Sequence, residues 1–176
     1  VDDFKPYLVA LNLTKRCNLK CDHCYLDATT KAAGGDDELS TEECFRLIDQ
    51  IAEVNKGCLL VITGGEPLVR LGIVDHVRRL LETSGIEAIA LTTNATLLRK
   101  YAADLAEAGL KRINISLDTL DPEVYAQVTR GGDLSNVLAG LDAAFAVGMG
   151  PVKLNVVVVR SLDQDLLGFA KMTIDR

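Results

Sequence analysis

The sequence predicts an α/β fold in which parallel strands alternate with helices and form part of a (β/α) barrel. Short runs rich in Val, Ile and Leu alternate with longer segments whose apolar residues recur at helical spacing. The strand-like runs are nearly continuous in apolar residues, as expected of parallel strands covered on both faces. No segment rich in Pro and Gly divides the 176 residues. We therefore expect one domain over residues 1–176, built from five strand–helix units.

Each expected element follows from residue type and spacing. Strands are expected over residues 7–13, 59–63, 88–92, 112–117 and 153–159. Ser40 and Glu43 form a capping box ahead of a helix that runs to Val54. Asp121 and Pro122 suit the N-cap and first turn of a short helix. The other expected helices cover residues 73–81, 97–108, 138–147 and 163–172, and residues 27–39 are expected to be a loose polar connection.

Polar side chains interrupt the apolar strands at a spacing of two. They are Asn12 and Thr14, then Thr92 and Asn94, then Asn114, Ser116 and Asp118, and finally Lys153 and Asn155. Alternate residues of a strand share one face, so each set lies on a single face near the carboxyl end of its strand. If the sheet curves, these side chains line a cavity where (β/α) barrels hold their active sites. Alternatively, Asn94 and Asp118 only cap the helices that follow.

Three of the five cysteines lie together after the first expected strand, at Cys17, Cys21 and Cys24. This spacing allows one loop to bring three thiolates to an iron–sulfur cluster, leaving one iron open to another ligand. A tetrahedral zinc site with His23 as the fourth ligand is an alternative. Inert or disulfide-bonded thiols are a third interpretation, which a reducing compartment disfavours. The other two cysteines, Cys44 and Cys58, are expected to be small buried apolar residues.

Composition excludes several classes of partner. A net charge of −6 and an isoelectric point near 4.9 argue against nucleic acid as the main partner. No apolar run approaches the roughly 18 residues that a membrane-spanning helix needs. The first residues show no signal-peptide pattern, so we expect a cytoplasmic protein with no membrane partner.

The spacing Cys17-x3-Cys21-x2-Cys24, together with Gly-Gly-Glu-Pro at 64–67, resembles the radical S-adenosylmethionine (radical SAM) superfamily over about residues 7–160. The resemblance implies a [4Fe–4S] cluster on the three cysteines, with S-adenosylmethionine (SAM) chelating the fourth iron. It also implies reductive cleavage of SAM to a 5′-deoxyadenosyl radical that takes hydrogen from the substrate, and hence an electron donor such as ferredoxin or flavodoxin. Relatives continue into a sixth strand and a C-terminal region, so we expect this chain to be a truncated fragment.

The same resemblance assigns roles to individual residues. His23 stands where relatives carry an aromatic residue against the adenine. Gly64 and Gly65 are expected to let the backbone approach SAM closely, and Glu66 to accept a hydrogen bond from the methionyl ammonium. Ser116 matches a position near the adenosyl group. The remaining expected cofactor contacts are Asp118 and Asn155.

For the substrate, two parts of the chain resemble different subfamilies. Residues 17–28 and the run that begins at Asp37 resemble radical enzymes of haem d1 and alternative haem synthesis, which remodel tetrapyrrole side chains. Residues 91–160 resemble the GTP 3′,8-cyclase of molybdenum cofactor synthesis, with Thr92 and Lys153 where that cyclase contacts GTP.

That cyclase, however, carries arginines at the positions of Ala10 and Val61, and guanidinium groups are the usual bidentate phosphate ligands. We therefore expect tetrapyrrole side-chain chemistry on an acetate or propionate arm. Cyclisation of GTP and maturation of a peptide are alternatives among radical SAM enzymes. A non-enzymatic zinc-binding module is the alternative of another class.

Overall fold

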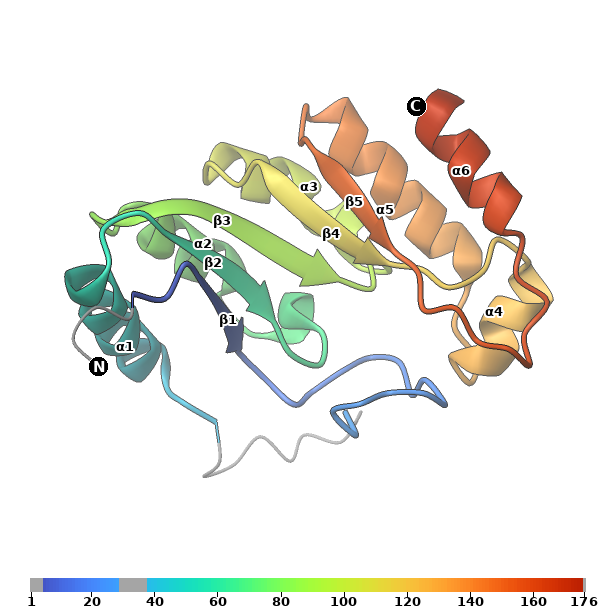
Figure 1. The fold of residues 1–176 in the computed structure, drawn as a ribbon, viewed down its shortest axis with the longest axis horizontal. Helices are drawn as coiled ribbons and strands as arrows, with labels where there is room; N and C mark the ends of the chain where they lie inside the picture. Colours follow the sequence, from blue (N-terminus) through green and yellow to red (C-terminus); the bar gives the residue numbers. More distant parts are fainter. Residues whose placement is uncertain (1–4, 29–37, 176) are drawn as a thin grey trace.

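The computed structural model describes residues 5–28 and 38–175, and it confirms the predicted α/β fold with parallel strands (Figure 1). Five strands form one sheet in sequence order. They are β1 (Leu8–Asn12), β2 (Cys58–Thr63), β3 (Ile86–Thr93), β4 (Arg112–Ser116) and β5 (Val152–Asn155). The helices are α1 (Thr41–Val54), η1 (Pro67–Val69), α2 (Ile73–Leu81), α3 (Leu98–Glu107), α4 (Pro122–Val128), α5 (Leu134–Ala146) and α6 (Leu166–Asp175). Most of the connection expected over residues 27–39, including Asp37, lies outside the described residues.

Helices cover one face of this sheet in the part of the chain that the structure describes, so the expectation that both faces are covered was wrong. In Figure 1 helices α2, α3 and α5 lie behind the curved sheet. Alternate strand residues pack on them: Leu60, Leu91 and Ile113 are at most 1% exposed. The residues between them stay half-buried or exposed on the concave inner face. Because polar residues recur on that inner face towards the carboxyl ends of the strands, the spacing of two was the informative pattern.

Local chemistry accounts for the helix starts that the sequence predicts. The capping box of α1 is present, with Glu43 N–H donating to Ser40 Oγ at 3.2 Å and Ser40 N–H donating to Glu43 Oε2 at 2.8 Å. The Asp121 carboxylate accepts from the first two free amides of α4, and Pro122 occupies its first turn. Because a helix N-terminus has amides without backbone partners, these side chains fix where each helix begins.

Strand β5 ends at Asn155, earlier than the expected residue 159. Val157 N–H donates to Asp118 Oδ1 at 2.7 Å, and Val159 N–H donates to Gln164 Oε1 at 2.8 Å. Side chains therefore take the amides that a longer strand would offer to a neighbour. Other boundaries also differ: α5 begins at residue 134 after the Asp133 N-cap, α6 begins at residue 166 rather than 163, and η1 was not expected.

Two further features bear on the expectations from composition. Cys44 and Cys58 are 2% and 0% exposed, which agrees with a role as small buried apolar residues. Among the described residues, no helix is both long enough and apolar enough to cross a membrane.

Candidate active site

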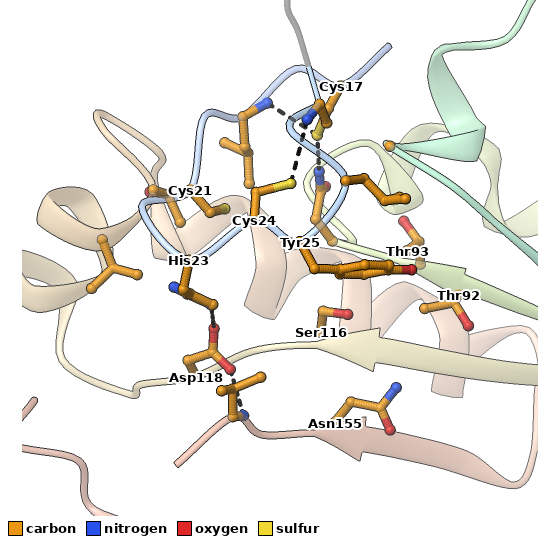
Figure 2. Close-up of a pocket in the computed structure, with 18 of the residues that line it drawn as sticks. Cys17, Cys21, His23, Cys24, Tyr25, Thr92, Thr93, Ser116, Asp118 and Asn155 are labelled. Carbon is orange, nitrogen blue, oxygen red and sulfur yellow. Dashed lines mark hydrogen bonds and ion pairs between the residues drawn. The ribbon is translucent and has the colours of Figure 1, made fainter. Parts of the chain in front are cut away.

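A cavity of about 390 Å³ opens between the carboxyl ends of the strands and the loop that follows β1 (Figure 2). Cys17, Cys21 and Cys24 all line it, and all three are free thiols. The strand ends contribute polar side chains: Thr63, Thr92, Thr93, Asn94, Ser116, Asp118 and Asn155. The structure thus brings strand ends that are far apart in the sequence around one cavity, as the spacing of two predicts.

Some residues of the predicted polar sets lie outside this cavity. Thr14 is 3% exposed and donates its hydroxyl to Glu38 Oε1 at 2.6 Å, so it anchors the loop instead. Asn114 lies one step further back on β4, where its side-chain amide donates to Thr92 Oγ1 at 3.1 Å. Asn12 is exposed at the end of β1. The cavity is therefore made by the last residues of β2 to β5 and the segments that follow.

The loop that carries the cysteines is held from two sides. On one side, Gly65 N–H donates to Thr14 O at 2.7 Å and Glu66 N–H donates to Arg16 O at 2.8 Å. On the other side, Asp22 N–H donates to Val128 O at the end of α4. The turn after β2 and the end of α4 together fix this loop over the sheet, which places the thiols before any ligand binds.

Gly64 and Gly65 allow this close approach of two backbones. Gly64 has φ +127°, and a Cβ built on it would lie 2.6 Å from Thr14 O. A Cβ on Gly65 would lie 2.2 Å from Arg16 O. We expected these glycines to make room for a ligand. Both do line the cavity, but the contact that excludes a side chain is with the cysteine loop.

Glu66 is buried next to the cavity and accepts three hydrogen bonds. Its side chain is 0% exposed and does not line the cavity. The carboxylate accepts from Leu68 N–H at 3.0 Å, Thr93 Oγ1–H at 2.7 Å and Asn94 N–H at 2.7 Å. Burial raises the pKa of Glu66 to about 6, although the three hydrogen bonds lower it. Glu66 therefore ties η1 to the end of β3, and its contact with a methionyl ammonium stays a prediction.

The three thiols influence one another electrostatically. Burial raises the pKa of Cys17, and burial together with the charges of the neighbouring thiolates raises the pKa of Cys21 to about 11. A cationic metal centre would offset that repulsion. Among the described residues, no three His, Cys, Asp or Glu side chains are placed to hold a single metal ion.

His23 points towards Asp118 and forms a pair with it (Figure 2). His23 Nε2 lies 2.8 Å from Asp118 Oδ2, and the other carboxylate oxygen accepts from Val157 N–H. Both side chains line the cavity. The imidazole is therefore part of the cavity wall, where a carboxylate fixes its orientation.

The Radical SAM superfamily model matches residues 11–172. The chain belongs to the radical SAM superfamily. Its relatives include GTP 3′,8-cyclases from several bacteria. It is 45% identical over 168 residues to that of Alkaliphilus metalliredigens, which covers 94% of this chain and 52% of the relative. It is 45% identical over 170 residues to that of Heliobacterium modesticaldum, which covers 96% of this chain and 51% of the relative. The chain thus spans about half the length of the curated relatives it matches.

Solved structures of radical SAM proteins share the fold. Streptococcus suis SuiB bound to S-adenosylmethionine superposes with a TM-score of 0.77 at 21% identity, over 97% of this chain and 38% of SuiB. Methylornithine synthase (PylB) superposes with a TM-score of 0.73 at 18% identity, over 97% of this chain and 51% of that protein. At such identities the likeness concerns the fold, and it agrees with the predicted partial barrel.

Radical SAM enzymes use a [4Fe–4S] cluster and SAM, and the residues of this cavity fit both groups. Three free cysteines of one loop line the same cavity, and two of them are thiols whose ionisation is disfavoured without a cation. Beside them, His23, Ser116, Asp118 and Asn155 supply polar groups at the strand ends. Cys17, Cys21 and Cys24 would hold the cluster.

Lys153 lies beside this radical SAM cavity and not in it. It lines a second hollow of about 590 Å³ along β5, which shares Asn155 with the first. In the sheet register Lys153 pairs with Asn114, and Asn114 pairs with Thr92. These three residues form one row across the inner face, and of the three only Thr92 lines the cavity.

A second cation on the inner face is Arg112, which sequence reasoning missed. It is exposed at the start of β4, two residues before Asn114, so it shares the face of Asn114. Its row continues through Ala90, Val61 and Ala10 on the neighbouring strands. The spacing of two that identified Asn114 and Ser116 extends back to Arg112. The same spacing could therefore have placed Arg112 on the inner face from the sequence.

The end of α4 also contributes to the cavity. Tyr125, Val128 and Thr129 line it, together with Leu19 from the cysteine loop and Thr119 from the segment before α4. Tyr125 is 4% exposed and Thr129 is 6% exposed. Their spacing of three and four places them on one side of a short helix, a pattern that marks a buried face without indicating what it faces.

Proposed function

We propose that this chain is the cluster- and SAM-binding part of a radical enzyme that acts on a guanine nucleotide, as GTP 3′,8-cyclase does. The observation that carries the proposal is the identity of 45% over 168 residues with a protein of that name. The expectation of tetrapyrrole chemistry rested on short runs, residues 17–28 and the stretch from Asp37. The similarity to the cyclases extends over 94% to 96% of the chain, so it supports the nucleotide and not the tetrapyrrole.

The residues of the cavity divide into three tasks. Cys17, Cys21 and Cys24 would hold the cluster, which when bound supplies the electron that cleaves SAM to a carbon radical. Polar groups at the strand ends, including Ser116 and Asn155, line the space beside the thiols and would orient SAM. The cysteine loop, fixed to the β2–η1 turn and to α4, closes that space on one side and limits access of water.

The substrate would lie over β4 and β5. Thr92 and Lys153 stand where the resemblance places contacts with GTP, and they belong to one row of the inner face. Ala10 and Val61 offer no charge, and they are paired in register on β1 and β2. The cations on the inner face are Arg112 and Lys153, so we place the phosphate groups near these two residues.

Calorimetric titration of GTP into the SAM-loaded protein tests this proposal. Lys153→Ala and Arg112→Ala should each weaken GTP binding about tenfold or more, because a charge-assisted hydrogen bond contributes about 1.5–3 kcal/mol. Lys111→Ala is the matched control, since Lys111 is exposed and directly precedes β4, and it should bind GTP as the wild type does. Failure of GTP to bind, or binding that both variants leave unchanged, would contradict the proposal.

A further inference from the structure

The hydroxyl of Tyr125 is a buried donor without an acceptor. The residue is 4% exposed and lines the cavity, and within residues 5–28 and 38–175 its hydroxyl has no hydrogen-bond partner. Leaving such a group unpaired destabilises the fold, because burial removes its hydrogen bond to water. Burial raises the pKa of Tyr125 far above its usual range, so the group stays a protonated donor. The fold thus keeps a donor in the cavity wall at a cost, which suggests a partner that arrives with a ligand.

The geometry of α4 places Tyr125 close to Cys21. Both chain neighbours of Cys21 are bonded to the end of that helix: Asp22 N–H donates to Val128 O at 2.9 Å, and Lys20 N–H donates to Thr129 O at 3.4 Å. Tyr125 lies one helical turn before these two carbonyls. The segment that carries Cys21 therefore rests on the turn that follows Tyr125.

A second contact joins the Tyr125 ring to the same loop. A Cβ built on Gly132 would lie 2.9 Å from Tyr125 Cε1 and 3.1 Å from Leu19 Cδ2. The ring and the Leu19 side chain therefore approach each other at Gly132. Leu19 lies two residues before Cys21 in the loop. Among the charged groups that raise the pKa of Tyr125, Cys21 has the largest effect, which agrees with this placement.

Among the three thiols of the described loop, Cys21 is the one without a donor from another residue. Cys17 Sγ accepts from Leu19 N–H at 3.4 Å and from the Asn94 side-chain amide at 3.8 Å. Cys24 Sγ accepts from Ala28 N–H at 3.5 Å. In the described part of the chain, Cys21 Sγ receives no hydrogen bond from another residue. The unpaired hydroxyl of Tyr125 and a thiol that accepts from no other residue thus line the same cavity.

We propose that Tyr125 donates its hydroxyl hydrogen to Cys21 Sγ when the cluster is bound, and that it is a positioning residue that sets the cluster's reduction potential. The inference rests on the cluster assignment and not on the identity of the substrate. Hydrogen bonds to cluster sulfurs stabilise the reduced, more negative cluster, and this makes reduction easier. Reduction of the cluster precedes the cleavage of SAM, so the bond would act on the first step of the reaction.

The test is an EPR-monitored redox titration of the reconstituted protein without nucleotide. Tyr125→Phe should shift the midpoint potential to more negative values and abolish one exchangeable-proton coupling in the ENDOR spectrum of the reduced cluster. Tyr101→Phe is the matched control, because Tyr101 lies on α3 and its hydroxyl oxygen accepts from Lys100. It should leave the potential unchanged. An unchanged potential in Tyr125→Phe with full iron content would overturn the proposal.

Stability without the cluster gives an independent readout. In the apo-protein the Tyr125 hydroxyl has no partner among the described residues. Tyr125→Phe should therefore leave the free energy of unfolding of the apo-protein unchanged or raise it. Loss of iron from Tyr125→Phe with an equally stable apo-protein would also support the bond to Cys21. A less stable apo-protein would show that the hydroxyl serves the fold, and would overturn the proposal. Neither measurement involves GTP, so both outcomes are separate from the test of the proposed function.

Discussion

Replacing Gly65 by alanine tests whether the contact between the two loops positions the cysteines. Gly65 follows β2, and a Cβ at this position would lie 2.2 Å from Arg16 O and 2.7 Å from Arg16 C. Both atoms are backbone, so no side-chain rotation can relieve the overlap. Arg16 directly precedes Cys17. The strain therefore acts on the loop next to the first thiol.

The structure sets the size of the effect. Ordinary van der Waals contact begins at 3.4 Å, so the two backbones must separate by about 1 Å. That movement breaks the bonds from Gly65 N–H to Thr14 O and from Glu66 N–H to Arg16 O. Two such bonds contribute about 1–3 kcal/mol in total. We expect Gly65→Ala to lower the free energy of unfolding by that amount and to reduce the iron bound after reconstitution.

Urea unfolding of the apo-protein and iron analysis of the reconstituted protein measure the two effects. Gly150→Ala is the matched control, because a Cβ on Gly150 meets nothing within 4 Å. It should change neither quantity. If Gly65→Ala unfolds like the wild type and binds a full complement of iron, then the loop contact does not position the thiols and the reasoning is wrong.

Two buried groups predict opposite dependences of stability on pH. The pKa of Glu66 is about 6, above its usual 4.5, so the folded state binds more protons than the unfolded state in this range. The free energy of unfolding therefore falls by about 2 kcal/mol as pH rises from 4.5 to 6. Urea unfolding of Glu66→Gln should show no such fall in stability between pH 4.5 and 6. A pH dependence identical to that of the wild type would contradict the prediction. His76, whose two ring nitrogens are buried without a partner among the described residues, has a pKa lowered from 6.5 to about 4 by burial. The unfolded state therefore binds more protons, stability falls as pH drops from 6.5 to 4, and His76→Phe should remove that fall while keeping the contact with Phe45. A variant as sensitive to acid as the wild type would show that His76 is not the group responsible.

Spacing and alternation predicted much of the fold and part of the site, because both follow from backbone geometry. The spacing of two in the polar residues of each strand was enough to place Thr92, Ser116 and Asn155 at one cavity. The end of β5 was not predictable in the same way. Its Val-rich continuation is typical of a strand, yet the amides of Val157 and Val159 donate to the side chains of Asp118 and Gln164.

The features of the site that the sequence did not predict have a common cause, since a sequence motif does not show what packs against it. Glu66 belongs to a motif associated with SAM, but its three donors come from segments that the motif does not contain. Tyr125 is one apolar position of a short helix in the sequence pattern, and its unpaired hydroxyl is visible only once the cysteine loop is placed on α4. Contacts between segments, and not residue type, decide these roles.

The central claim is that Cys17, Cys21 and Cys24 hold an iron–sulfur cluster, and metal analysis of anaerobically reconstituted protein tests it most directly. We predict about four irons with matching acid-labile sulfide per chain. Alanine at any of the three positions should abolish that content, whereas Cys44→Ala and Cys58→Ala should retain it, because both are buried away from the cavity. A colourless protein with one tightly bound zinc, or iron content that the three cavity cysteines do not affect, would contradict the cluster assignment.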